Sequence, residues 1–123
     1  MAEEGAVIEI LLVDESLGDI RFTQEVLKEC PFPFHLSVVQ DGEAALAFVH
    51  QQPPYADAPR PDVVLVDLHL PKKEGLELLA EIKGDPALCA LQVIVLLSAE
   101  YEQEVLGPMS PLIDGVLFKP SGL

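Results

Sequence analysis

The stretch Val63-Val64-Leu65-Val66-Asp67 decides the fold, because an uninterrupted apolar run ends there directly in a carboxylate. Such a run is typical of a strand that is buried on both faces of a parallel sheet, since an exposed face would show polar residues at alternate positions. Similar, largely apolar runs end in polar residues elsewhere in the chain. These runs are 7–13 before Asp14, 93–97 before Ser98 and 116–118 before Lys119.

Helix-like stretches separate these runs. The first has Ser16 as its N-cap, with Asp19 three residues later in a spacing close to that of a capping box, and it ends before Pro31. The other elements that we expect are a short strand at 36–39, helices at 42–49 and 76–83, and a weak helix at 99–106. Strands that alternate with helices in this way predict an α/β fold, with a doubly wound five-stranded parallel sheet and helices on both of its faces.

Length and composition limit the class of protein. With 123 residues, half of them hydrophobic, the chain is expected to form a single domain over 1–123 and not a disordered segment. The formal net charge of −14 argues against a nucleic-acid partner, because such binding needs Lys and Arg to displace counterions. A basic partner or a metal ion fits this charge better.

The sequence also predicts where the protein acts. No apolar run approaches the roughly 18 residues that are needed to cross a membrane. The acidic N-terminus lacks the basic region of a signal peptide, and Cys30 and Cys89 form no CxxC motif. We therefore expect a reduced, cytoplasmic protein without a membrane partner.

The residues that follow the strands are the candidate site. In an open parallel sheet, ligands bind at the carboxyl ends of the strands, which places Asp14, Glu15, Asp67, Ser98 and Lys119 on one rim. Each of them alone has an ordinary explanation, as a turn residue, a helix cap or a solvated lysine. Together, three carboxylates repel one another unless a cation lies among them, and Mg²⁺ suits such oxygen ligands.

The motifs at these positions resemble the receiver domain of two-component response regulators. The matching motifs are Leu12-Val13-Asp14-Glu15, Val66-Asp67-Leu68-His69-Leu70-Pro71 with Gly75, Val95-Leu96-Leu97-Ser98-Ala99, and Lys119-Pro120. The stretches GDIRFTQEVLKE, YADAPRPD and DLHLPKKEG are similar to the single-domain subfamily that serves bacterial phytochromes. The resemblance covers nearly the whole chain and implies a flavodoxin-like sheet topology.

The resemblance also implies a phosphoryl-transfer site. Asp67 would be the phosphoacceptor, which takes a phosphoryl group from phosphohistidine on a sensor histidine kinase, in this subfamily a phytochrome. Asp14 and Glu15, with Asp67 and the backbone carbonyl of His69, would bind Mg²⁺. The physics agrees with these roles, because phosphoryl transfer needs in-line positioning and neutralisation of the phosphoryl oxygens.

The last strands would complete this site. By the resemblance, Lys119 pairs with the phosphoryl oxygens, and the peptide bond before Pro120 is cis. Counting without gaps places Leu97 at the switch position of the family's Ser or Thr, with Ser98 one residue late as the nearest hydroxyl. Val116 stands where many members carry a mobile aromatic residue. We therefore expect the acceptor side of the site to be intact and the readout side to be altered.

The sequence differs from the family's pattern in two other features, which are a metal-ligand position and the end of the chain. Glu15 stands where the family has the Asp that binds Mg²⁺ directly, and its extra methylene moves the carboxylate. The chain ends shortly after Pro120, so the fifth helix of a receiver is missing. An uncovered apolar face is unusual on a monomer. We therefore expect either a longer native chain or a homodimer that covers this face.

The sequence leaves two further functions open. A pseudo-receiver would keep the fold as an interaction module with weak or no phosphorylation, which would fit Glu15 and Leu97. A phosphatase with an Asp nucleophile, of the haloacid dehalogenase type, would use the same residue types. It would need a second Asp two residues after the nucleophile, where this chain has His69, and a cap for which the chain has no room.

Overall fold

The computed structural model describes residues 7–67, 75–88, 90–97 and 114–118. The strands are β1 (Ile8–Val13), β2 (Phe34–Val39), β3 (Val63–Asp67), β4 (Gln92–Leu97) and β5 (Gly115–Phe118). The helices are α1 (Leu17–Leu27), α2 (Gly42–Val49) and α3 (Gly75–Gly84). From β1 to β4 the strands and helices alternate as the sequence predicts, and none of the described helices is long and apolar enough to cross a membrane.

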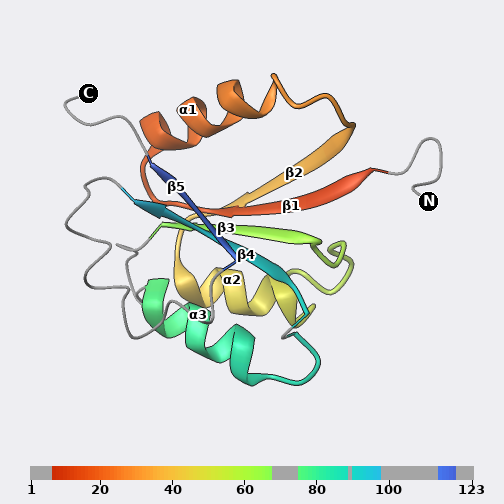
Figure 1. Cartoon of the computed structure of the whole chain (residues 1–123). Helices are drawn as coiled ribbons and strands as arrows, with labels where there is room; N and C mark the ends of the chain where they lie inside the picture. The colour runs from red at the N-terminus through yellow and green to blue at the C-terminus, as the bar shows by residue number, and fades with distance from the viewer. Residues whose placement is uncertain (1–6, 68–74, 89, 98–113, 119–123) are drawn as a thin grey trace.

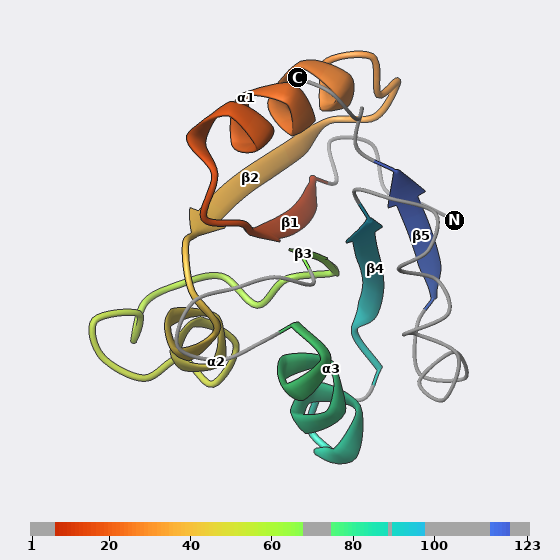
Figure 2. The ribbon, with the colours of Figure 1, turned by 90° about the vertical axis from the view of Figure 1, so that its left-hand side faces the viewer.

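The sheet has five parallel strands in the order β2-β1-β3-β4-β5. Helix α1 covers one face, and α2 and α3 cover the other (Figures 1 and 2). The predicted doubly wound, flavodoxin-like sheet is therefore confirmed. The chain winds outward from β1 to β2 and then returns to β3 on the other side of β1, so the strand order reverses between β1 and β3.

The apolar runs are continuous because their side chains enter cores on both faces of the sheet. Along β1, Leu11 and Val13 belong to the core beneath α2 and α3, whereas Ile10 and Leu12 belong to the core beneath α1. This is the alternation that a strand imposes on successive side chains. Over its buried part, Ile10 to Val13, strand β1 carries no polar residue, and the carboxylate of Asp14 follows directly.

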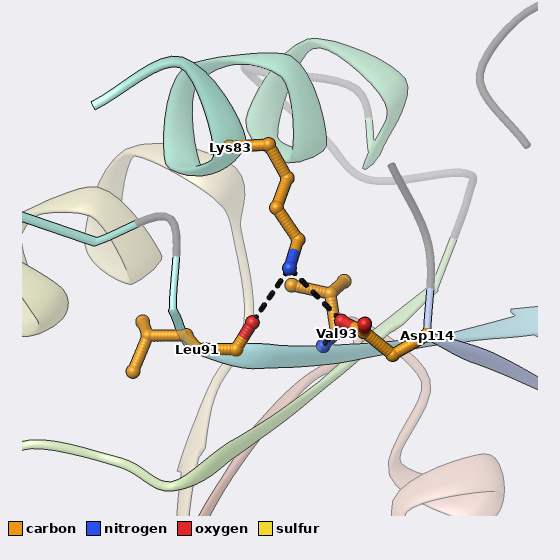
Figure 3. A network of polar contacts seen from close by, with 4 residues as sticks. All are labelled: Lys83, Leu91, Val93 and Asp114. Atoms are coloured by element: carbon orange, nitrogen blue, oxygen red, sulfur yellow. Dashed lines mark hydrogen bonds and ion pairs between the residues drawn. The ribbon is translucent and has the colours of Figure 1, made fainter. Parts of the chain in front are cut away.

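A polar cluster fastens α3 to the beginnings of β4 and β5 (Figure 3). The Lys83 Nζ donates to the Leu91 carbonyl at 2.7 Å and pairs with Asp114 Oδ2 at 2.9 Å. The same Asp114 oxygen accepts the Val93 N–H at 2.8 Å. This N–H, and then the Lys83 ammonium, hold the pKa of Asp114 below its ordinary value of 3.8. The cluster lies at the amino ends of the strands, opposite the edge where the strands end.

Several expectations fall outside the described residues. They concern the weak helix at 99–106, the side chains of Ser98 and Lys119, the carbonyl of His69, the peptide bond before Pro120 and the missing fifth helix. Within the described residues, the bond between Pro53 and Pro54 is cis.

Candidate functional site

The site begins with Asp14, the residue directly after β1. Its side chain is fully buried, and its backbone N–H donates to the Val39 carbonyl at 3.1 Å, which extends the ladder between β1 and β2 by one bond. Its Oδ1 accepts the Ser16 N–H at 3.0 Å. Backbone and side chain thus hold this carboxylate at the carboxyl edge of the sheet.

Asp67 comes from the neighbouring strand. It is the last residue of β3 and is half-buried. The register pairs Val13 with Val66, so that Asp14 and Asp67 are the next residues on adjacent strands. They flank the position where the strand order reverses, which is where open α/β sheets bind ligands.

A third carboxylate joins them from α1. Asp14, Asp19 and Asp67 each offer an oxygen, and the three oxygens lie within 4.8 Å of one another. Among the described residues, Asp14, Asp19 and Asp67 are the ligating side chains that lie close enough together to hold a metal ion. Three hard oxygen donors at this spacing fit a divalent cation such as Mg²⁺ or Mn²⁺. The donor set of this chain is thus suited to a divalent metal.

The predicted and observed groups differ in one member. Asp14 and Asp67 come together as expected, but Glu15 is exposed and its carboxylate is not part of the group. The Glu15 backbone carbonyl accepts the Gln40 Nε2 at 3.5 Å. The sequence predicts Asp19 only as a capping residue. The signal that could have identified it is its place in the first turn of a helix that begins at the same edge as Asp14.

The remaining predicted residues are placed only in part. Leu97 ends β4, where it pairs with Phe118, and Val116 lies in β5 opposite Val95. Their switch roles therefore stay predictions. The roles of His69, Ser98, Lys119 and Pro120 also stay predictions, because these residues lie outside the described part of the chain.

Comparison with known proteins identifies the family. The sequence profile of the response regulator receiver domain matches residues 10–123. Response regulator Rcp1 of Synechocystis sp. is 43% identical over 114 residues, which are 93% of this chain and 78% of Rcp1. The probable methanogenesis regulatory protein FilR2 of Methanothrix harundinacea is 29% identical over 90% of this chain and 71% of its own length.

Solved structures agree with this assignment. The Mn²⁺-bound form of Rcp1 superposes with a TM-score of 0.82 at 42% identity, covering 92% of this chain and 81% of that chain. The phosphorylated cyanobacterial phytochrome response regulator RcpA gives 0.83 at 39% identity, covering 94% and 82%. The bacteriophytochrome response regulator AtBRR gives 0.86 at 32% identity, covering 94% and 84%. With its sheet order, its aspartate cluster and these matches, the chain belongs to the response regulator receiver domain family.

Proposed function

We propose that this receiver, a single domain over 1–123, accepts a phosphoryl group on Asp67 from a sensor histidine kinase in a Mg²⁺-dependent reaction. The phosphorylated receiver would then signal through a change in its conformation or in its association with other proteins. The observation that carries the proposal is the grouping of Asp67 with Asp14 and Asp19 at the point where the strand order reverses. Phosphorylated RcpA and Mn²⁺-bound Rcp1, both similar to this chain, support the chemistry.

The proposed reaction is a substitution at phosphorus. A carboxylate oxygen of Asp67 attacks the phosphorus of phosphohistidine, and the P–N bond breaks as the P–O bond of an acyl phosphate forms. The electron pair of the P–N bond returns to the imidazole, which takes up a proton. Water later hydrolyses the acyl phosphate to inorganic phosphate and restores the Asp67 carboxylate.

The other residues of the site would neutralise charge. The divalent cation, when bound, offsets the negative charge of the phosphoryl oxygens. Asp14, Asp67 and Glu15, with the His69 carbonyl, are the ligands that the family resemblance implies. Lys119 and Ser98 would contact the phosphoryl oxygens by the same resemblance. The described geometry supports Asp14 and Asp67 most directly.

The partners follow from the relatives. Two structural neighbours are named as a phytochrome and a bacteriophytochrome response regulator, which supports a phytochrome-type sensor kinase as the phosphodonor. A homodimer and a cytoplasmic location stay predictions from the sequence. Sedimentation over a range of protein concentrations would test the homodimer.

Phosphorylation by a small donor tests the proposal. We expect incubation with acetyl phosphate and Mg²⁺ to add one phosphoryl group per chain, seen by intact-mass spectrometry, and chelation of Mg²⁺ to prevent it. Asp67→Asn should abolish the addition. Asp57→Asn is the matched control, because Asp57 is exposed in the loop between α2 and β3 and should leave the addition unchanged.

Other outcomes would support the other functions. If no phosphoryl group is added by either acetyl phosphate or a phosphorylated histidine kinase, the pseudo-receiver interpretation holds and the proposal is wrong. Rapid, continuous hydrolysis of many phosphomonoesters would instead support the phosphatase interpretation.

A further inference from the structure

We propose that the outer edge of strand β2 binds an extended, basic segment of a partner protein as an additional strand of the sheet. In this segment, apolar residues would alternate with Lys or Arg. The proposal concerns a surface that the proposed phosphoryl transfer does not use, so it stands or falls independently of that function. Its starting point is that β2 is the outermost strand in the order β2-β1-β3-β4-β5, with β1 as its neighbour on one side.

The backbone groups of every second residue in β2 point away from the sheet. At the start of β2, the Pro33 carbonyl accepts the Ile8 N–H at 3.1 Å. At its end, the Val39 carbonyl accepts the Asp14 N–H at 3.1 Å. Because the backbone groups of successive residues in a strand point to alternate sides, the odd-numbered residues of β2 face β1. The residues whose N–H and C=O groups point outward are therefore Phe34, Leu36 and Val38.

The sequence of β2 lacks the features that keep edge strands from pairing with other chains. Such features are a proline, a charged side chain such as lysine, or a β-bulge. The segment 34–39 contains no proline and no Lys, Arg, Asp or Glu. Its register with β1 runs without interruption from the Ile8–Phe34 pair to the Val13–Val39 pair, so no bulge bends it away. The outer edge of β2 is thus suited to pairing with another strand.

The side chains along this edge indicate what an added strand would carry on one of its faces. Phe34 and Leu36 are half-buried and border the core beneath α1. Val38 lies on the same face, because alternate side chains of a strand share a face, and it is 37% exposed. Phe32, just before the strand, is 63% exposed. Apolar residues of an added strand would cover this row of apolar side chains.

The charge at both ends of β2 favours a basic segment. At the amino end, Glu9 is the cross-strand neighbour of His35, and its Oε1 lies 2.9 Å from the His35 Nδ1. At the carboxyl end, the Glu15 carbonyl accepts the Gln40 Nε2 at 3.5 Å, and Glu43 lies in the first turn of α2. Glu15 and Glu43 are exposed, and neither forms an ion pair with another described residue. Lys or Arg side chains of an added strand would therefore meet negative charge at either end.

A second copy of this chain suits the edge less well than a basic partner. Each copy has a formal net charge of −14, so two copies repel each other at close approach. The described lysines are also engaged elsewhere, Lys28 with Glu25 and Lys83 with Asp114. A basic segment instead gains charge attraction together with the main-chain hydrogen bonds of strand addition.

Hydrogen exchange of single amides, followed by NMR on the whole chain, tests the proposal. The probe is a peptide of sequence Lys-Val-Lys-Val-Lys-Val with both ends blocked. In the free chain, we expect the outward amides of Phe34, Leu36 and Val38 to exchange faster than the other amides of β2. A saturating amount of the peptide should slow these three amides by about tenfold or more, because each gains a hydrogen bond.

Two control peptides separate strand addition from simple charge attraction. The sequence Glu-Val-Glu-Val-Glu-Val keeps the alternation and reverses the charge, whereas Lys-Lys-Lys-Val-Val-Val keeps the charge without the alternation. Neither control should protect the three amides at the concentration at which the probe does. Equal protection by either control peptide would overturn the proposal.

Variants of the chain locate the binding surface. Val38→Lys places a positive charge on the edge itself and should weaken binding of the probe by about tenfold. Val26→Lys is the matched control, because Val26 is 39% exposed on α1, and it should change the affinity by less than about twofold. Val38→Pro keeps the charge and removes one outward N–H without removing a bond to β1, and it should also weaken binding.

The remaining outcomes contradict the proposal. Absence of protection by the probe, or protection only at amides away from β2, would refute strand addition. Equal losses of affinity in Val38→Lys and Val26→Lys would refute the edge as the binding surface. Protection of the same amides that rises with protein concentration, without any peptide, would show that a second copy occupies the edge. None of these outcomes bears on the phosphorylation of Asp67.

Discussion

Ser16 forms hydrogen bonds with both the end of β1 and the start of α1. It caps α1, since its Oγ accepts the Asp19 N–H, and it also donates its own N–H to the buried Asp14 carboxylate. Its carbonyl accepts the Ile20 N–H at 2.9 Å as the first bond of the helix. A single small polar residue thus joins the end of β1 to the start of α1.

Removing this cap should weaken the fold. We expect Ser16→Ala to lower the free energy of unfolding by about 1 kcal/mol, because an N-terminal N–H of α1 loses its acceptor. Urea unfolding at neutral pH measures the change. Ser16→Thr keeps the hydroxyl and should lose less than about half of that amount. Equal losses in both variants would show that packing at this position, and not the cap, matters.

The strand-end part of the site could be predicted from the sequence, and the helical part could not. Asp14 and Asp67 each follow an apolar run directly, so their place at the edge follows from strand periodicity and parallel pairing. The place of Asp19 depends on the direction in which the chain leaves β1, which the Asp14–Ser16 hydrogen bond sets. That bond spans only two residues, but apolar periodicity does not reveal it, and so the sequence predicts Asp19 only as part of the cap of α1.

At the scale of elements, the polar cluster of Lys83, Leu91, Val93 and Asp114 joins α3 to the beginnings of β4 and β5. Lys83 lies in the last turn of α3, and its side chain is only 11% exposed. It reaches the chain before β4 through the Leu91 carbonyl and the chain before β5 through Asp114 (Figure 3). The cluster therefore holds the helix against the amino ends of both strands.

Loss of this lysine should be measurable as loss of stability. We expect Lys83→Met to lower the free energy of unfolding by about 1–2 kcal/mol, since the charge-assisted contacts with the Leu91 carbonyl and with Asp114 are lost while the apolar stem is kept. Chemical denaturation measures it. Lys28→Met is the matched control, because its ion pair with Glu25 is fully at the surface and should contribute little. An equally large loss of stability in Lys28→Met would contradict the stabilising role that we assign to Lys83.

The same cluster predicts a pH dependence. The pKa of Asp114 is held below 3.8 in the folded chain, chiefly by the Val93 N–H and further by Lys83, so its ionised form stabilises the fold at higher pH. That contribution is fully present above the ordinary value and is lost as the pH falls through the lowered pKa. The stability difference between the unaltered chain and Asp114→Asn should therefore be constant above about pH 5 and shrink below 3.8. A difference that does not change with pH would contradict this prediction.

Element boundaries were predicted well where the pattern is strong. The expected strand at 93–97 is found at Gln92–Leu97, and the expected helix at 42–49 is Gly42–Val49 with Asp41 as its cap. Strand β2 is longer than expected, because pairing with β1 extends it back to Phe34, directly after a proline-containing turn. Its length is thus a property of the sheet and not of its own sequence.

At the scale of the whole molecule, the described residues form cores of unequal size on the two faces of the sheet. The core beneath α2 and α3 contains more buried side chains than the core beneath α1, and the smaller core, like the larger one, has half-buried apolar residues at its border. The border residues of the smaller core are Ile8, Leu27, Phe34, Leu36, Val63 and Ile94. The sequence predicts helices on both faces, but this difference depends on packing that its pattern does not encode.

One Leu to Ala substitution on each face of the sheet should show this difference in packing. Leu78 of α3 is completely buried, and Leu78→Ala should cost about 3 kcal/mol or more through lost burial and an unfilled cavity. Leu27 of α1 is half-buried, so Leu27→Ala should cost about 1 kcal/mol. Denaturation curves of the two variants, each compared with that of the unaltered chain, measure both costs. Equal costs would mean that the two faces are equally well packed.

The most direct test of the central claim is the identity of the phosphorylated residue. After treatment with acetyl phosphate and Mg²⁺, borohydride reduces an aspartyl phosphate to homoserine, which peptide mass spectrometry locates in the chain. Asp67 ends β3 within the carboxylate cluster, and we expect homoserine at position 67 and at no other aspartate. Homoserine at position 14 or 19, or unreduced aspartate at 67 in a chain that carries a phosphoryl group, would contradict the account.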